Sequence, residues 1–448
     1  MSSSVAFELI PAPDPWLVAR TLAHLPNLLF LDSSEAHPDR GRYSYVMADP
    51  ETIASGRAGG INPLPHLYDV LVKHDHIEGL PPFQGGIAGL FGYELGREFE
   101  RIPEPRSDVF QVPDLFVGAY SWVVSFDHAQ NRAWVVAKDE SMLRAAMGHL
   151  QSNPGADAPR SPAQPLSITH QHPLIGFPGV GSNFDRAGYE AAVARVVEYI
   201  RAGDCYQVNL SQRLLAPLRE HPLDLYGRLR QLSPAPFSAY FDLGEFQILS
   251  TSPERFLKVE RGEVETRPIK GTRPRGRTPE EDAALIADLL ANPKDRAENV
   301  MIVDLLRNDL GRVCEFGSVT VPKVCELESF RHVHHLVSEV RGKLRPGCGP
   351  LDLLKAAFPG GSVTGAPKVR AMEIIAELEP TARGPYCGSL GWIGFDGGMD
   401  TNILIRTFTA GGGWLQFPVG GGIVADSDPR REYEETLHKA AGLLKALA

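Results

Sequence analysis

The chain has 448 residues, of which 43% are hydrophobic and 22% are charged, an ordinary composition for a globular enzyme. Its length is sufficient for two or three domains or for one large α/β unit. The formal net charge of −10 argues against a general affinity for nucleic acid or acidic membranes, so neither is expected as a partner.

The sequence carries no pattern of a secreted or membrane-inserted protein. Its first residues lack the basic stretch and apolar core of a secretory signal, and no apolar run approaches the roughly 20 residues that span a bilayer. The five cysteines are scattered and include no Cys-x-x-Cys pair, which predicts free thiols rather than disulfides or a zinc site. We therefore expect a cytoplasmic protein.

Residues 1–150 are predicted to form a mostly β N-terminal domain. Strand-like runs occur at 27–34 and 41–46, and residues 115–137 have the pattern of a hairpin. The glycine-rich apolar run at 85–94 lacks the spacing of a dinucleotide-binding loop, so close packing in a sheet explains it better.

Residues 151–183 are rich in Pro, Gly, Ser and Ala, which predicts a linker before a longer domain at 184–448. In that second domain the periodicity predicts helices at 185–203, 279–290 and 296–310 and another from about 431. A further helix is predicted to begin after Ala366, with Pro367 in its first turn. Strands are predicted at 205–210, 237–243, 246–251, 255–259, 263–268, 388–393, 402–409 and 414–419. Strands and helices do not alternate regularly, so the fold class is α+β with antiparallel sheets.

Lys270 lies at the end of a predicted hairpin, between Ile269 and Gly271. Pro268 ends regular pairing and Gly271 permits a turn, so the lysine is presented at a bend. A lysine in such a place can be a nucleophile if burial lowers its pKa; the alternative is a solvated turn lysine. The nearby run of Arg273, Arg275 and Arg277 has no interleaved aromatic residues, which favours a solvated loop over a nucleic-acid site.

Two acidic pairs have helical spacing. Asp295 and Glu298 lie three residues apart at a predicted helix start, and Glu432 and Glu435 lie three apart in the last helix. Each spacing places both carboxylates on one helical face. Two such faces brought together would provide the oxygen ligands that Mg²⁺ prefers; the alternative is two solvated helix ends.

Two further stretches contain groups that could bind a ligand. Gly360 and Gly365 have Walker spacing, but Ala366 replaces the required lysine, so a nucleoside triphosphate site is not expected. The backbone N–H groups at the following helix could still bind an anion; the alternative is a simple turn. Among His332, His334 and His335, a strand would point His335 away from the other two. One functional histidine is therefore a better interpretation than a metal site.

Taken together, these motifs resemble those of the chorismate-utilising enzymes. The resemblance runs in family order from about residue 185 to the C-terminus. It includes the stretches 252–254, 268–272, 296–299, 307–309, 335–338, 361–368, 384–388, 405–407 and 420–427. It implies two packed antiparallel sheets flanked by helices, with the active site in the C-terminal part.

The resemblance also implies roles for individual residues. Glu254 would be the general acid, Lys270 a catalytic group, and His335 an orienting or electrostatic group over the substrate. Mg²⁺ would be bound by Glu298 and Glu435, with Asp295 and Glu432 behind them, and would hold the ring carboxylate of chorismate. The pyruvyl carboxylate would be held by Tyr386 and Arg406, helped by backbone N–H groups of Gly365, Gly420, Gly421 and Gly422. Thr364 and Gln207 would also bind the substrate.

Two positions distinguish the members of this family. Water-adding members have a lysine base where this chain has Gln207, and anthranilate-forming members have alanine where it has Lys270. The resemblance therefore implies a member that forms aminodeoxychorismate through a lysine intermediate, with anthranilate formation as the alternative. Ammonia would come from a separate glutamine amidotransferase subunit. Residues 31–34 resemble a tryptophan-binding stretch but have Asp32 in place of glutamate.

Overall fold

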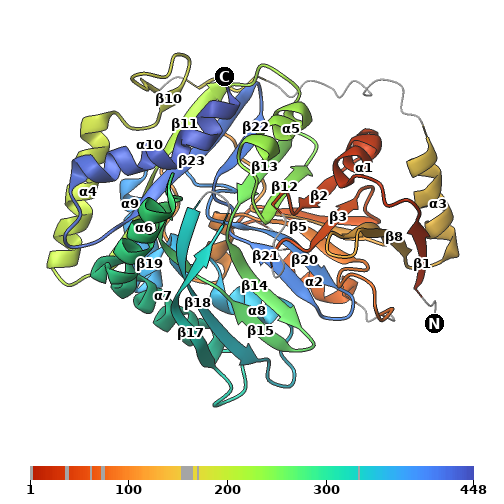
Figure 1. Ribbon diagram of the computed structural model, residues 1–448. Helices are drawn as coiled ribbons and strands as arrows, with labels where there is room; N and C mark the ends of the chain where they lie inside the picture. The colour runs from red at the N-terminus through yellow and green to blue at the C-terminus, as the bar shows by residue number, and fades with distance from the viewer. Residues whose placement is uncertain are drawn as a thin grey trace.

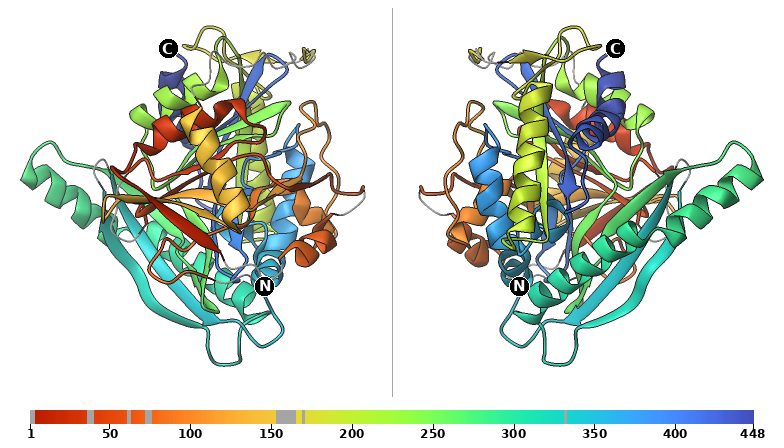
Figure 2. Two further views of the ribbon diagram at one scale, coloured as in Figure 1. Left: turned by 90° about the vertical axis from the view of Figure 1, so that its right-hand side faces the viewer. Right: turned by 90° about the vertical axis from the view of Figure 1, so that its left-hand side faces the viewer.

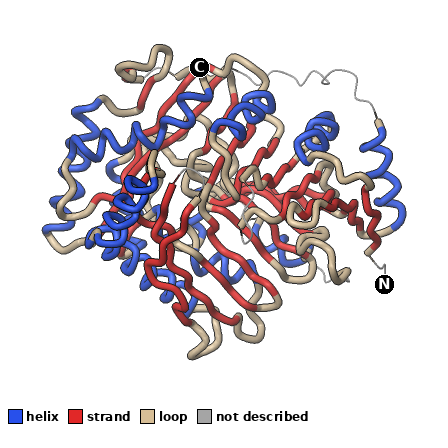
Figure 3. The backbone as a smooth tube through the Cα atoms, in the orientation of Figure 1, coloured by secondary structure: helices blue, strands red, loops and turns tan. Residues whose placement is uncertain are grey.

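The computed structural model describes residues 4–35, 40–60, 63–71, 76–152, 165–168, 171–330 and 333–448. Two antiparallel sheets form the centre of the molecule and helices cover their outer faces (Figures 1 and 3), which confirms the predicted α+β class. His332 and residues 153–164 and 169–170 of the predicted linker lie outside the described residues.

The larger sheet has 13 strands, with β19 (Gly365–Ala366) paired to β11 off the main order. Its order is β1 (Val5–Leu9), β8 (Arg132–Ala137), β7 (Trp122–Asp127), β3 (Tyr43–Met47), β2 (Leu29–Asp32), β12 (Phe237–Asp242), β13 (Phe246–Ser252), β22 (Thr407–Gly411), β23 (Trp414–Ile423), β11 (Gln207–Pro217), β10 (Gly181–Ser182) and β9 (His172–Pro173).

The smaller sheet has 10 strands, with β17 (Thr320–Ser329) paired to β18 off the main order. Its order is β16 (Ile269–Pro274), β18 (Val333–Lys343), β15 (Glu263–Thr266), β14 (Arg255–Glu260), β21 (Met399–Asn402), β20 (Ser389–Gly394), β5 (Gly86–Phe91), β6 (Leu115–Tyr120) and β4 (Thr52–Gly56). Both sheets thus contain strands from either side of residues 151–183, so the predicted domain boundary does not separate the sheets.

Helices and alternating strand residues build the core in layers. In β2 and β3, Leu29 and Tyr45 pack between the sheets, whereas Phe30 and Val46 pack under helices. The helices on that outer face are α1 (Pro15–Thr21), α3 (Glu140–Gln151), α5 (Pro222–Leu232) and α10 (Pro429–Ala446). Helix α7 (Pro293–Gly311) packs against β16 and β18 of the smaller sheet, and α8 (Pro350–Ala357) packs on α7. Helices α4 (Arg186–Arg201) and α9 (Lys368–Leu378) pack against β11 of the larger sheet.

The remaining helices are short or lie at the edge of the molecule. They are α2 (Leu64–Val70), α6 (Pro279–Ala291), and the 3₁₀ segments η1 (Leu22–His24), η2 (Tyr93–Glu98) and η3 (Gly361–Val363). In Figure 2, α6, α7 and the strands β17 and β18 project beyond the rest of the chain. No described helix has both the length and the apolar character needed to cross a membrane.

Most predicted elements are present, and the differences have local causes. Helix α7 begins at Pro293 because Asn292 caps it, and Pro367 is the N-cap of α9 rather than part of its first turn. The strand predicted at 402–409 is wrong as a single element. Residues 403–406 separate β21 in one sheet from β22 in the other, and Arg406 has a φ of +51° there.

Candidate active site

The chain crosses between the two sheets at two neighbouring places, and each crossing carries a predicted site residue. Glu254 lies between β13 and β14, and Arg406 lies between β21 and β22. Backbone hydrogen bonds join the crossings: Ile403 N–H donates to the carbonyl of Glu254 at 3.0 Å, and Thr251 N–H donates to that of Arg406 at 3.1 Å. The fold itself therefore brings these two residues together.

Glu254 is buried and has the environment of a proton donor. The Ser362 hydroxyl donates to Glu254 Oε1 at 2.8 Å. Burial raises the pKa of the Glu254 carboxyl, although Ser362 and Lys270 act in the opposite direction. A carboxyl whose proton is retained closer to neutral pH suits general acid catalysis.

Lys270 lies in β16 beside a bulge in the pairing with β18, where Gly271 has a φ of +76°. Its Nζ donates to Glu298 Oε1 at 2.8 Å and to the carbonyl of Ser362 at 3.2 Å. The lysine side chain is only 12% exposed, so the solvated turn lysine is the wrong interpretation. Ser362 connects Lys270 to Glu254, since its carbonyl accepts from one and its hydroxyl donates to the other.

The acidic pair on α7 is bonded to cations and an amide. Glu298 accepts from Lys270 and from Gln207 Nε2, both at 2.8 Å. Burial opposes ionisation, but Lys270 and Gln207 hold the pKa of Glu298 below its usual value. Asp295 pairs with Arg273 at 3.2 Å, and burial raises the pKa of its carboxyl.

The acidic pair on α10 lies beside the end of β23. The Ser427 hydroxyl donates to Glu432 at 2.6 Å, and Lys439 pairs with Glu435 at 2.8 Å. Burial raises the pKa of Glu432. A Cβ added at Gly421 would lie 3.4 Å from oxygens of both Glu432 and Glu435, so these acids cover that glycine.

Glu298 of the α7 pair lies by the next glycine, because a Cβ at Gly422 would lie 2.8 Å from Glu298 Oε1. Among the described residues, however, no three His, Cys, Asp or Glu side chains gather closely enough to hold a metal ion. The donors are all carboxylate oxygens, which fit Mg²⁺, but each is bonded to a protein group here. The magnesium site stays a prediction.

Among the described strands, the glycine backbone near this point is paired on one side only, and the carbonyl of Gly420 accepts from Lys439 Nζ at 2.9 Å. Gly420, Gly421 and Gly422 pair with β11 on one side, and in the described chain β22 pairs only with residues 414–416 of β23. Gly365 pairs with Val208 of β11 on the other side of that strand, where any Cβ would collide with the Gln207 carbonyl. Thr364 is also fixed to β11, since Asn209 N–H donates to its carbonyl at 2.8 Å.

His335 and His334 have separate environments, as alternation along β18 predicts. The Nδ1 of His335 lies 2.9 Å from the Thr272 hydroxyl, and its ring contacts that of Phe330 at 5.6 Å between centroids. Burial, reinforced by the positive charge of Arg406, lowers the pKa of His335 to about 4. The ring is therefore neutral at pH 7, which favours orientation of a ligand over charge stabilisation.

Tyr386 is buried on a loop bound to the crossing that carries Arg406. Cys387 N–H donates to the carbonyl of Leu404 at 2.8 Å, and Leu404 N–H donates to that of Gly388 at 2.9 Å. Burial raises the pKa of Tyr386 well above its usual value, so its hydroxyl keeps its proton. Burial also lowers the pKa of Arg406.

Three residues of this network were not singled out from the sequence: Ser362, Arg273 as a partner of Asp295, and Lys439. Ser362 lies within the motif at 361–368, and Lys439 follows Glu435 at the i, i+4 spacing of a helical ion pair. The arginine run is not a free basic patch. Arg273 pairs with Asp288, Arg275 with Asp282, and Arg277 with Glu281.

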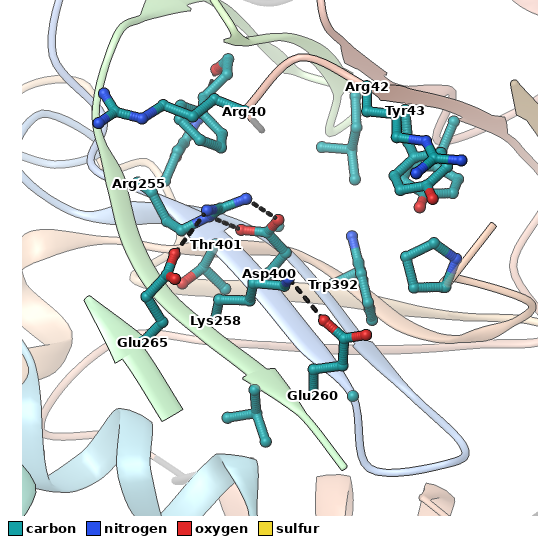
Figure 4. Close-up of a pocket in the computed structure, with 18 of the residues that line it drawn as sticks. Arg40, Arg42, Tyr43, Arg255, Lys258, Glu260, Glu265, Trp392, Asp400 and Thr401 are labelled. Carbon is teal, nitrogen blue, oxygen red and sulfur yellow. Dashed lines mark hydrogen bonds and ion pairs between the residues drawn. The ribbon is translucent and has the colours of Figure 1, made fainter. Parts of the chain in front are cut away.

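A large cavity of about 1260 Å³ is lined by none of the predicted catalytic, substrate-binding or metal-binding residues. Figure 4 shows Arg255 in its wall, bonded to Asp400 and Glu265. Residues 31–33 of the predicted tryptophan-binding stretch reach this cavity. The carboxylate of Asp32 is already engaged, however, since it accepts from Tyr226 at 2.9 Å and from Arg230 at 2.7 Å.

Comparisons with known proteins place the chain in one family. The model of the chorismate binding enzyme family matches residues 31–445. Aminodeoxychorismate synthase component 1 of Escherichia coli is 43% identical, covering 95% of this chain and 94% of that protein. Anthranilate synthase component 1 of Thermus thermophilus is 44% identical, covering 88% and 85%. The crystal structure of anthranilate synthase component I from Streptococcus pneumoniae matches with a TM-score of 0.78 at 34% identity, covering 92% and 93%.

Proposed function

The chain belongs to the chorismate-binding enzyme family, and we propose that within it the chain is component I of an aminodeoxychorismate synthase. This enzyme exchanges the ring hydroxyl of chorismate for an amino group, toward para-aminobenzoate and folate. Lys270 carries the proposal, because it lies buried between Glu298 and Ser362 where the family pattern of anthranilate formation has alanine.

Chorismate carries two carboxylates, and the site offers a separate set of donors for each. Arg406 supplies a buried cation and Tyr386 a protonated hydroxyl for the pyruvyl carboxylate, and the backbone of Gly420–Gly422 supplies further donors. Glu298 and Glu435 would hold Mg²⁺ with Asp295 and Glu432 behind them. When bound, Mg²⁺ would neutralise the ring carboxylate.

The reaction proceeds in two displacements. Lys270, after losing its ammonium proton to solvent, forms a C–N bond to the ring while the C–O bond to the hydroxyl breaks, and Glu254 supplies the proton that releases water. Ammonia then bonds to the carbon that lost the hydroxyl, loses a proton, and the bond to Lys270 breaks. Covalent catalysis divides one difficult displacement into two easier steps.

Two features support ammonia over water as the incoming nucleophile. Gln207 provides an uncharged amide, bonded to Glu298, where water-adding relatives have a lysine base. His335, neutral at pH 7, orients the substrate without adding charge.

We assign the ammonia supply to a separate glutamine amidotransferase subunit. All five cysteines are free, which supports our placement of the enzyme in the reducing cytoplasm.

Anthranilate synthase component I is the alternative, because relatives of both kinds are similar at 43% and 44% identity. Product analysis decides between them. The purified chain is incubated with chorismate, Mg²⁺ and an ammonium salt at alkaline pH, where free ammonia is plentiful. We expect 4-amino-4-deoxychorismate without release of pyruvate. Anthranilate with stoichiometric pyruvate would refute the proposal.

A further inference from the structure

Glu94 is a buried acid of η2 and is not among the predicted site residues. Its two carboxyl oxygens accept from the backbone N–H groups of Arg383, at 2.8 Å, and Gly384, at 2.9 Å. Tyr93 N–H donates to the carbonyl of Gly384 at 2.8 Å. Three hydrogen bonds therefore attach the N-terminal part of the chain to the loop that carries Tyr386.

The side chain of Arg383 extends this attachment to the rest of the site. It forms a two-point ion pair with Glu379 and donates to the carbonyls of Asn209 at 2.6 Å and Val363 at 3.0 Å. Its guanidinium lies 4.7 Å from the centre of the Tyr93 ring. The residue that Glu94 holds by its backbone thus joins β11, η3 and the Tyr386 loop.

The loop needs such support because its backbone is unusual. Gly384 has a φ of +59° and Cys387 has a φ of +63°, in a backbone region that residues other than glycine rarely adopt. At Gly388, any Cβ would collide with the Phe91 carbonyl just before η2. Contacts from the N-terminal part therefore fix the shape of the loop at both ends.

We infer that Glu94 is a positioning residue, which holds the 383–388 loop so that Tyr386 and Arg406 face the pyruvyl carboxylate of the substrate. The inference rests on the proposed function for the identity of that substrate. It assigns the N-terminal part of the chain a share in a site that the motifs place wholly in the C-terminal part.

The protonation of Glu94 is consistent with this role. Burial, with a contribution from Asp114, raises the pKa of Glu94 to about 8. Both oxygens of a protonated carboxyl can still accept from an N–H group, and a neutral group avoids the cost of a buried charge. Replacement by glutamine keeps the volume but leaves one acceptor, whereas alanine leaves none.

The test compares Glu94→Ala and Glu94→Gln with wild type in two measurements. Steady-state kinetics gives KM for chorismate and kcat, and hydrogen exchange gives the protection of the amides of residues 383, 384 and 386–388 without any substrate. We expect Glu94→Ala to raise KM at least tenfold with kcat within about threefold, with faster exchange in the loop. For Glu94→Gln we expect KM and loop exchange between those of wild type and Glu94→Ala. This variant remains informative if the alanine variant does not fold.

Asp242→Asn is the matched control, because Asp242, at the end of β12 in the larger sheet, is also a buried acid that accepts from a backbone N–H group, that of Gly244. It leaves KM and loop exchange unchanged. Unchanged exchange in both Glu94 variants overturns the inference, and so does faster exchange with an unaltered KM. A wild type that forms anthranilate refutes the proposed function alone, since KM for chorismate and loop exchange remain measurable.

Discussion

Replacing Lys270 by methionine should tighten the binding of Mg²⁺, because the lysine and the metal need the same carboxylate. Lys270 Nζ lies 2.8 Å from Glu298 Oε1, and both side chains are mostly buried. At an effective dielectric constant of about 20, this separation corresponds to a gross attraction of roughly 6 kcal/mol. Desolvation offsets much of it, and close buried pairs retain about 1.5 kcal/mol or more.

A metal that displaces Lys270 must overcome that net attraction in wild type but not in the variant. Since 1.4 kcal/mol corresponds to a factor of ten, we expect Lys270→Met to bind Mg²⁺ at least tenfold more tightly in calorimetric titration. Lys258→Met removes a lysine paired with the exposed Glu260 and serves as the control with unchanged affinity. An equal or weaker affinity in Lys270→Met would refute the competition, and with it the place of Glu298 in the metal site.

Three further outcomes are expected. The pKa of His335 is about 4 in the folded chain and about 6.5 in the unfolded chain, so the unfolded state binds more protons between these pH values. The free energy of unfolding, measured by thermal melts, should therefore fall by about 3 kcal/mol as pH falls from about 6.5 to 4. His335→Gln should reduce that loss. Glu298→Gln and Glu435→Gln should each abolish turnover with an unchanged circular dichroism spectrum, whereas near-normal activity at limiting Mg²⁺ would exclude them as ligands. The chain alone should use ammonium but not glutamine, and glutamine-dependent activity without another subunit would contradict the separate amidotransferase.

Much of the fold could be predicted from local patterns, but the composition of the sheets could not. Periodicity and turn residues located most strands, including β2 and β12. Nothing in either segment indicates that these two strands, far apart along the chain, pair with each other. The same long-range pairing joins β5 to β20. The proline-rich stretch at 151–183 therefore suggested two domains where the chain builds two shared sheets.

The candidate site followed from motifs, while its connections required the fold. Lys270 and Glu254 belong to separate motifs, and only the structure shows Ser362 between them. Arg406 was identified from its motif, but the strand predicted at 402–409 missed its position between the sheets, because a β-rich composition does not reveal where a chain leaves one sheet for another. Glu94 gave no signal at all, since an acid in an apolar run reveals neither its burial nor the amides it accepts from.

The account depends most directly on a bond between Lys270 and the substrate ring. Wild type is mixed with chorismate and Mg²⁺ in the absence of ammonia, quenched with acid, and analysed by intact-protein mass and peptide mapping. We predict an adduct with the mass of chorismate less one water, located on Lys270 and absent from Lys270→Ala. If wild type carries no adduct and Lys270→Ala forms aminodeoxychorismate as fast as wild type, Lys270 is not the nucleophile.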